Sequence, residues 1–191
     1  MRLILTLIAA AILVGNLTAC APVVVGAAAE GGLMAADRRT SGAYVEDEAI
    51  EWKGLKQIND ALGDKIHVNV TSYNRNVLLT GEASDDTAKQ KAESVVKGIE
   101  NVRTVTNELV VGMASSMTAR SNDSYITTKV KSRMLTENKF PANYVKVVTE
   151  GSTVFLMGMV TRKEADDAVE IARGTDGVEK VVKVFEYVVV Q

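Results

Sequence analysis

The 191-residue sequence has one cysteine, one histidine, two prolines and only 5% aromatic residues. A single cysteine excludes an internal disulfide and a paired-thiol redox centre, and one cysteine with one histidine cannot form a Cys/His zinc site. The formal net charge of −2 gives no reason to expect nucleic acid as a partner. The sequence contains no phosphate-binding glycine loop, no dinucleotide fingerprint and no serine with a histidine in register. We therefore expect no enzyme activity, no cofactor and no metal site.

The amino-terminal segment has the layout of a secretory signal. Arg2 precedes an apolar run from Leu3 to Val14, and small residues then lead to Cys20. The apolar run has about 12 residues, whereas a helix that spans a bilayer needs about 20. We therefore expect residues 1–19 to be a cleaved signal peptide.

The residues Leu17-Thr18-Ala19-Cys20 resemble a bacterial lipobox, in which a signal peptidase cuts before the cysteine. This resemblance implies a diacylglycerol on the thiol of Cys20, followed by a third acyl chain such as palmitate. Two chains already anchor a protein stably, so three would hold it permanently on a membrane. The alternative is an incidental thiol beside an ordinary cleavage site. The residue after Cys20 is Ala21 and not aspartate. In this the chain resembles lipoproteins that are sorted to the periplasmic face of the outer membrane.

Residues 20–45 have the composition of a flexible tether. They are rich in alanine and glycine and have no sustained helical or alternating pattern. As a coil, such a segment has an r.m.s. span of roughly 25–30 Å. The folded part of the protein could therefore contact the membrane that holds its anchor.

The rest of the chain contains an internal repeat, with residues 46–111 as the first copy, residues 122–191 as the second and residues 112–121 as a linker. Each copy reads helix, strand, strand, helix, strand. The two copies keep the same order of strand ends and helix ends over their whole length. The matched pairs are Val77–Gly81 with Val154–Gly158, Lys97-Gly98 with Arg173-Gly174, and Ile50, Gly54 and Ile58 with Ile126, Val130 and Met134.

The first helix of the second copy has an apolar face formed by Ile126, Val130 and Met134, which are spaced by four residues. Asp123 lies just before this face, and we expect it to be the N-cap. The second helices are expected to start at Ser84 and at Thr161.

In the second copy, Thr161 and Glu164 predict a capping box. Both second helices end on a basic residue followed by a glycine, Gly98 or Gly174, that is expected to take the left-handed position.

The expected strands are rich in β-branched residues. The hairpin strands predicted at His67–Tyr73 and Tyr144–Thr149 alternate in polarity, and Asn74-Arg75-Asn76 and Gly151-Ser152 offer residues that tolerate positive φ at the turns. His67 is expected to be an ordinary strand residue. Long final strands are expected at Val102–Val111 and Val178–Val190.

This element order, the Val-x-Leu-x-Gly strand ending and the basic-Gly helix ending resemble the BON domain. With the lipobox, the chain resembles the dual BON-domain outer-membrane lipoproteins, the division and outer membrane stress-associated lipid-binding protein family. The first copy departs from the pattern between Trp52 and Gly63, where Gly54 replaces a core-forming residue. The resemblance implies an α+β fold of two αββαβ domains, each a three-stranded mixed sheet with two helices. It also implies binding of anionic phospholipids, such as phosphatidylglycerol or cardiolipin, and a role in envelope integrity.

Charge distinguishes the two copies. Residues 46–111 carry 12 acidic and 8 basic side chains, a net charge of −4, whereas residues 129–146 carry five basic side chains and one acidic side chain. Near an anionic surface each Lys or Arg contributes about 1 kcal/mol. We therefore expect the first helix of the second copy to bind phospholipid through the face opposite its apolar stripe. The candidate residues are Tyr125, Thr128, Lys129, Lys131, Ser132, Arg133 and Leu135.

An alternative interpretation assigns these charges to ordinary solvent exposure and packs Tyr125 against the first copy. In that case the two domains would be a periplasmic scaffold for an envelope protein, and only Cys20 would contact the membrane. The long final strand of the second copy could then offer a free edge for strand addition.

Overall fold

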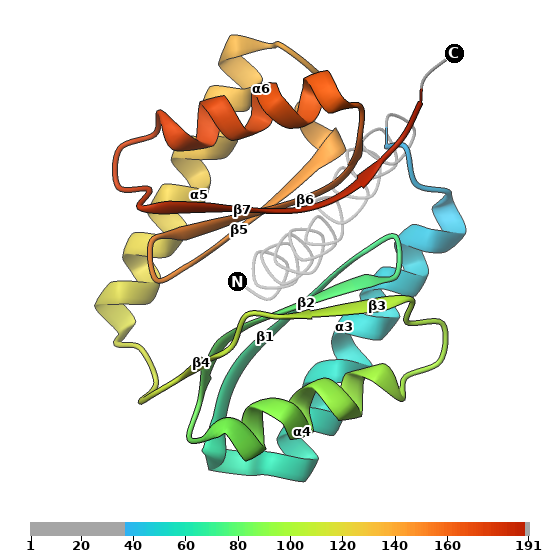
Figure 1. Cartoon of the computed structure of the whole chain (residues 1–191), viewed down its shortest axis with the longest axis vertical. Helices are drawn as coiled ribbons and strands as arrows, with labels where there is room; N and C mark the ends of the chain where they lie inside the picture. Colours follow the sequence, from blue (N-terminus) through green and yellow to red (C-terminus); the bar gives the residue numbers. More distant parts are fainter. Residues whose placement is uncertain (1–36, 190–191) are drawn as a thin grey trace, which may run out of the picture. The chain divides into compact units, whose positions relative to one another are not determined.

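The computed structural model describes residues 37–189, which Figure 1 shows as helices and strands. The expected signal peptide at residues 1–19, the lipidation site Cys20 and the tether up to residue 36 lie outside the described residues. From Arg38 onward the chain forms one compact unit. Among residues 37–189, no helix combines the length and the apolar character that a membrane span requires.

The two repeats have the same order of elements, except that the final strand of the first repeat is divided into β3 and β4, so its sheet has four strands and not the expected three. The expected α+β fold is confirmed. The first repeat consists of α3 (Ser41–Leu62), β1 (Ile66–Tyr73), β2 (Asn76–Ala83), α4 (Asp86–Lys97), β3 (Thr104–Asn107) and β4 (Val110–Val111). The second repeat consists of α5 (Met117–Glu137), β5 (Val145–Glu150), β6 (Thr153–Val160), α6 (Arg162–Arg173) and β7 (Lys180–Tyr187). Short 3₁₀ turns, at Gly63–Lys65 and Ala142–Tyr144, precede β1 and β5.

Both sheets are mixed. In the first, β2 pairs antiparallel with β1 and parallel with β3 and β4. In the second, β6 pairs antiparallel with β5 and parallel with β7. The final strand of the first repeat is interrupted between β3 and β4, where Leu109 turns into the core and is 1% exposed. The uninterrupted strand expected at Val102–Val111 is therefore wrong, and the last strand of the second repeat is also shorter than expected.

The first helix of each repeat starts earlier than its sequence suggested. Thr40 caps α3, which begins inside the expected tether, and Ser116 caps α5, which begins inside the expected linker. Each cap accepts a hydrogen bond from the amide three residues later, which satisfies a donor that the first turn would otherwise leave open. Gly54 does not interrupt α3. A Cβ there would lie only 3.0 Å from a Val70 methyl group, so the absent side chain lets the helix approach β1 closely.

Asp123 is not an N-cap, which corrects the sequence prediction. It lies within α5, is 6% exposed, and accepts hydrogen bonds from the backbone N–H groups of Gly151 and Ser152 at 3.0 and 2.9 Å. Asp123 therefore fixes the β5–β6 turn to α5.

Asp47 of α3 has the equivalent role in the first repeat. Its carboxylate accepts from the backbone N–H groups of Asn74 and Arg75 at 2.8 and 2.7 Å and from the Ser72 hydroxyl at 2.6 Å.

The hairpin turns follow the prediction, since Asn74, Arg75, Gly151 and Ser152 all have φ between 50° and 65°. The capping box at Thr161 is also confirmed. In the first repeat, however, the N-cap of the second helix is Asp85 rather than Ser84.

The glycines that follow the second helices do not take the left-handed conformation, because Gly98 and Gly174 have φ of −82° and −80°. The chain reverses three residues later instead. Asn101 and Gly177 adopt positive φ there, at 69° and 94°.

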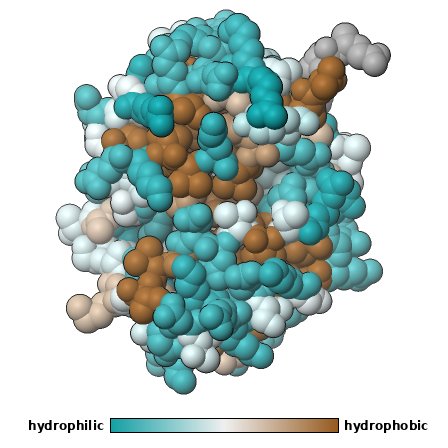
Figure 2. All heavy atoms as spheres, in the orientation of Figure 1, coloured by the Kyte–Doolittle hydropathy of each residue, from teal (hydrophilic) through white to brown (hydrophobic). Residues whose placement is uncertain are grey.

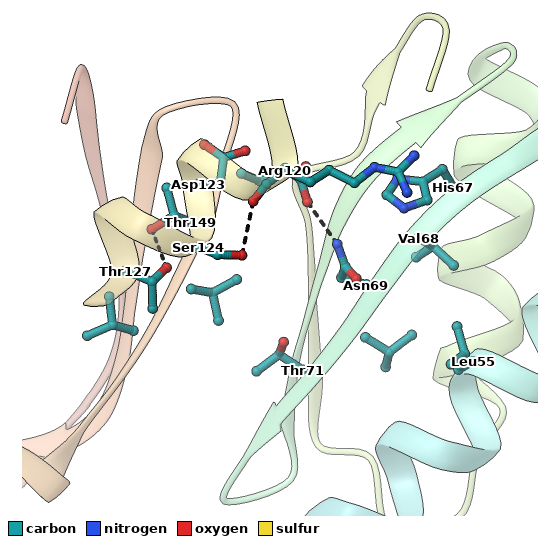
Figure 3. A pocket seen from close by; sticks show the side chains of 14 residues that line it. Leu55, His67, Val68, Asn69, Thr71, Arg120, Asp123, Ser124, Thr127 and Thr149 are labelled. Atoms are coloured by element: carbon teal, nitrogen blue, oxygen red, sulfur yellow. Dashed lines mark hydrogen bonds between the residues drawn. The ribbon is translucent and has the colours of Figure 1, made fainter. Parts of the chain in front are cut away.

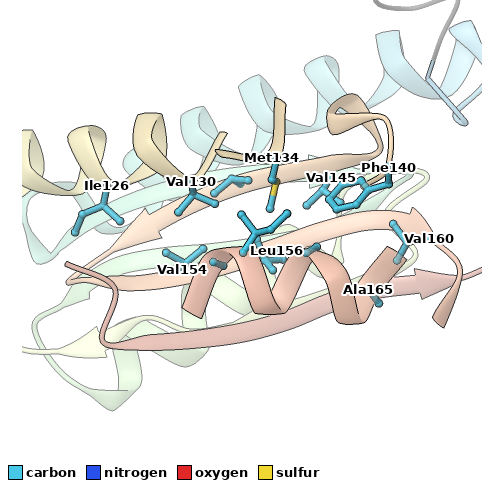
Figure 4. Packing of buried hydrophobic residues seen from close by; sticks show 13 residues of the cluster. Ile126, Val130, Met134, Phe140, Val145, Val154, Leu156, Val160 and Ala165 are labelled. Atoms are coloured by element: carbon cyan, nitrogen blue, oxygen red, sulfur yellow. The ribbon is translucent and has the colours of Figure 1, made fainter. Parts of the chain in front are cut away.

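Each repeat has its own core between its sheet and its helices. In the second repeat the face formed by Ile126, Val130 and Met134 is at most 1% exposed and packs against Leu156 of the sheet (Figure 4). The predicted apolar face of α5 is therefore confirmed.

The two sheets pack against each other through a third cluster formed by Tyr73 and Leu78 of the first repeat and Phe155 and Met157 of the second. The helices lie on the outer faces of the two sheets. The first helix of each repeat therefore buries one side against its sheet and exposes the opposite side to solvent.

Candidate functional site

The candidate surface lies on α5, on the side opposite its buried face. Tyr125 and Leu135 are large, largely apolar side chains that are 62% and 69% exposed. Thr128, Lys131 and Ser132 are exposed between them, whereas Lys129 and Arg133 are partly buried. The seven predicted residues therefore share one helix, but two of them also contact the body of the domain.

Lys129 and Lys131 carry the charge that remains available on this face. The Nζ atom of Lys129 lies 5.1 Å from the centre of the Tyr125 ring, where an ammonium group and an aromatic face attract each other. Neither lysine forms an ion pair with an acidic side chain among residues 37–189. These two lysines are therefore the cations of this surface whose charge no ion pair with a described acidic side chain offsets, although Asp176 lies in the same hollow as Lys129.

Arg133 is committed to the fold, which the sequence did not indicate. Its Nη1 donates to the carbonyl oxygen of Ile171 at 3.0 Å and to the Thr175 hydroxyl at 3.1 Å, which caps the carboxyl end of α6. Its Nη2 donates to Glu137 at 2.7 Å. Arg133 therefore contributes less free charge to the surface than its position on the helix suggests.

The other two basic residues of the segment 129–146 are also paired. The Nζ atom of Lys139 lies 3.1 Å from Oε2 of Glu170, and the Nζ atom of Lys146 lies 2.6 Å from Oε1 of Glu51 in the first repeat. Lys146 also donates to the carbonyl oxygen of Ser72, so it connects the two domains. Of the five basic side chains counted in the sequence, Lys129 and Lys131 are the two that no acidic group neutralises in the described part of the chain.

A shallow hollow of about 450 Å³ lies beside this face. The sequence predicted its α5 side but not the opposite wall, which is formed by the turn after α6. One feature of the sequence could have indicated this wall. It is the basic residue followed by glycine at the end of α6, which aligns with the same ending in the first copy. The lining residues are Thr128, Lys129, Ser132 and Arg133 from α5, together with Gly174, Thr175 and Asp176.

The equivalent helix of the first repeat has a different surface. The repeat offset places Ala49 where α5 has Tyr125 and Leu55 where it has Lys131. Trp52 is 66% exposed on this helix, an aromatic position that the charge pattern of the sequence did not indicate. The surrounding domain is acidic overall, so α3 lacks the cationic setting of α5.

A separate apolar patch lies near the end of the first repeat. Figure 2 shows brown atoms at the lower left, where β4 lies in Figure 1. Val110, Val111 and Met113 are 62%, 47% and 93% exposed there. No cationic side chains were predicted in this segment.

Among residues 37–189, no group of three His, Cys, Asp or Glu side chains is placed to hold a metal ion. His67 lies on β1, and its Nδ1 is 2.9 Å from a carboxylate oxygen of Glu82 on the neighbouring strand. This contact agrees with the expectation of an ordinary strand histidine.

The BON domain family model matches the chain twice, over residues 47–113 and 122–188. The chain is 39% identical over 173 residues to the outer membrane lipoprotein DolP of Haemophilus influenzae, covering 90% of both proteins. It is 39% identical to the 21 kDa hemolysin of Actinobacillus pleuropneumoniae, covering 80% of this chain and 79% of the relative. It is 30% identical to the osmotically-inducible protein Y of Escherichia coli, covering 73% and 72% respectively.

None of these three names denotes an enzyme, and the family model is that of a domain without a catalytic designation. The match to DolP extends over 90% of the chain. Lipidation of Cys20, which lies outside the described residues, stays a prediction. The chain therefore belongs to the BON domain family, as an outer-membrane lipoprotein of the DolP type with a role in the envelope.

Proposed function

We propose that the protein binds anionic phospholipids through α5 of its second BON domain and thereby supports the integrity of the outer membrane. The contact residues would be Tyr125, Thr128, Lys129, Lys131, Ser132, Arg133 and Leu135. A single observation carries this proposal. The exposed face of α5 has two lysines without an acidic partner among the described residues, together with two exposed apolar side chains.

This combination suits the boundary between headgroups and acyl chains. The ring of Tyr125 and the side chain of Leu135 can enter the interface while the phenol stays hydrated. Lys129 and Lys131 can reach phosphate oxygens, and the hydroxyl of Ser132 can donate to them. The hydroxyl of Thr128 donates to the carbonyl oxygen of Ser124 at 2.9 Å, so Thr128 would contribute contact area at the rim of the site. Lipidation of Cys20 would keep the domain near the bilayer, so each individual contact can be weak.

Vesicle flotation of the mature chain with Cys20→Ser tests the proposal, because this variant has no lipid anchor. We expect it to float with vesicles that contain phosphatidylglycerol or cardiolipin, and to be released at high salt. Replacing both lysines, Lys129→Glu with Lys131→Glu, should reduce partitioning by about thirtyfold or more, since each lysine contributes about 1 kcal/mol near an anionic surface.

The matched control is Lys53→Glu with Lys91→Glu, which makes the same charge change at two exposed positions of the first domain. This control should float almost as well as the parent. Equal loss in both double variants would mean that net charge, and not α5, governs binding. If no vesicles bind the parent, the scaffold interpretation with an envelope protein as partner becomes the better account.

A further inference from the structure

A groove of about 560 Å³ lies between the two repeats and shares no lining residue with the hollow beside the candidate lipid surface. Its volume falls within the range of roughly 300–1,000 Å³ that is typical of ligand sites. Figure 3 shows β1 on one side and α5 with β5 on the other. Leu55 of α3 closes the apolar end, and His67 and Arg120 lie at the polar end.

The wall formed by β1 has unpaired backbone groups. The two-residue turn makes Tyr73 and Asn76 a hydrogen-bonded pair, so Thr71 and Asn69 also direct their N–H and C=O groups towards β2. The groups of Val68 and Val70 must then point away from β2, at the open edge of the sheet. No backbone or side-chain partner within residues 37–189 pairs with these groups.

Such an edge is a template for another strand. The outward groups of Val68 and Val70 are two residues apart, which is the spacing at which an antiparallel partner forms its hydrogen-bonded pairs. Both valines belong to the groove lining, so a strand bound there would lie inside a formed site and not on a flat surface.

The opposite wall specifies the charge of that strand. Glu150 at the end of β5 accepts one hydrogen bond, from the Asn69 side chain at 2.9 Å, and forms no ion pair within the described residues. Arg120 also lines the groove, but its Nε and Nη2 donate to Ser115 and not to Glu150. Glu150 is therefore a half-buried carboxylate that a cation from a ligand can reach.

The electrostatic environment supports this assignment. Burial raises the pKa of Glu150, and the nearby carboxylates of Glu82 and Asp123 raise it further, against the opposing hydrogen bond from Asn69. Bringing a cation next to this group would relieve the cost of its burial.

We propose that the groove binds an extended peptide segment, which adds a strand along β1 and places a lysine or arginine side chain beside Glu150. Alternate side chains of this strand point to opposite sides. Those on one side meet the apolar surface near Leu55, and those on the other meet Asn69 and Glu150. The ligand is thus a polypeptide in which basic and apolar residues alternate.

The test uses the mature chain with Cys20→Ser and two acetylated, amidated seven-residue peptides. In one, lysine alternates with valine and threonine, and in the other glutamate replaces lysine. Titrations followed by fluorescence anisotropy give the Kd, and amide hydrogen exchange followed by NMR gives the position. We expect the lysine peptide to bind more tightly and to protect the amides of Val68 and Val70, while Asn69 and Thr71 are already protected by β2.

Two substitutions at one position test the charge. Glu150→Gln keeps an acceptor for Asn69 and should weaken the lysine peptide by about tenfold, since a charge-assisted hydrogen bond is lost. Glu150→Lys should reverse the preference in favour of the glutamate peptide. Glu100→Gln removes an exposed carboxylate outside the groove and should change neither Kd.

Three results would overturn the proposal. They are no binding of the lysine peptide at millimolar concentration, binding without protection of Val68 and Val70, and equal Kd values in the parent and Glu150→Gln. Displacement of the peptide from β1 by short-chain phosphatidylglycerol would assign the groove to lipid instead. Lys129→Glu with Lys131→Glu should leave peptide binding unchanged, so this proposal and the phospholipid proposal can fail separately.

Discussion

Two buried aspartates, Asp47 and Asp123, have the same role in the two repeats although their sequence surroundings differ. Each lies in the first helix and holds the hairpin turn of its own domain through backbone N–H groups. Asp47 has a further partner, because Arg39 forms an ion pair with it at 2.9 Å. A carboxylate in this position accepts hydrogen bonds from the N–H groups of the turn, which would otherwise need water as their acceptor.

We expect Asp123→Ala to lower the free energy of unfolding by about 2–4 kcal/mol, because two amides lose a charged acceptor. Asp47→Ala should cost more, since it also leaves the Ser72 hydroxyl and Arg39 without this partner. Urea denaturation gives both values. Ser124→Ala, at an exposed neighbouring position on α5, is the control and should stay within about 0.5 kcal/mol of the parent. Equal stability of Asp123→Ala and the control would refute the turn-holding role.

At the residue scale, periodicity predicted the core but not the polar contacts. The spacing of Ile126, Val130 and Met134 was sufficient, because a helix places residues four apart on one face. An aspartate before such a face is also a common N-cap, so the sequence could not separate that role from the observed one. The commitment of Arg133 was equally hidden, since its partners Ile171 and Thr175 are about forty positions away.

At the scale of elements, each hairpin depends on a glycine at the point where its strands approach most closely. A Cβ at Gly81 would overlap with the carbonyl oxygen of His67, and one at Gly158 would overlap with that of Tyr144. Gly81 also has a φ of 113°, which other residues rarely adopt. The Val-x-Leu-x-Gly ending recognised in the sequence therefore has a steric cause.

Gly81→Ala should destabilise the first domain by about 3 kcal/mol or more, because it adds both backbone strain and an overlap with β1. Gly151→Ala separates the two effects. Gly151 also has positive φ, but a Cβ there would have no atom within 4 Å, so the strain alone should cost about 1 kcal/mol. Thermal unfolding followed by circular dichroism compares the variants. Similar losses at both positions would argue against the steric cause.

Element boundaries were less predictable than element order. The segments before α3 and α5 looked like a tether and a linker because they are rich in small and polar residues. The caps Thr40 and Ser116 instead extend both helices into these segments. A cap is a local signal, but it identifies a helix start only when the following residues are already known to be helical.

At the scale of the whole folded unit, two adjacent arginines connect the start of α3 to both repeats. Arg38 donates to both carboxylate oxygens of Glu164 at 2.7 and 2.8 Å and to the carbonyl oxygen of Met159 at 2.8 Å. Arg39 pairs with Asp47 and stacks over the ring of Tyr73 at 4.1 Å. These contacts join residues up to 126 positions apart, and no local pattern in the sequence could have revealed them.

The Arg38 contact should make domain docking sensitive to acid. Burial alone would raise the pKa of Glu164, but the hydrogen bonds from Arg38 and Thr161 outweigh it and lower that pKa below its ordinary value of 4.5. A lowered pKa in the folded state stabilises the protein above the unfolded value. This contribution is lost as the pH falls through the lowered value.

Arg38→Gln should therefore reduce the free energy of unfolding by about 1–3 kcal/mol at pH 7, because a paired charge-assisted contact is removed. The difference from the parent should shrink as the pH falls below 4.5, since protonated Glu164 no longer pairs with Arg38. Urea denaturation between pH 7 and pH 3.5 measures both effects. The control is Arg103→Gln, which removes an exposed ion pair with Glu186 and should cost less than about 1 kcal/mol. A constant difference for Arg38→Gln across this pH range would show that Glu164 is not the group through which Arg38 stabilises the docked domains.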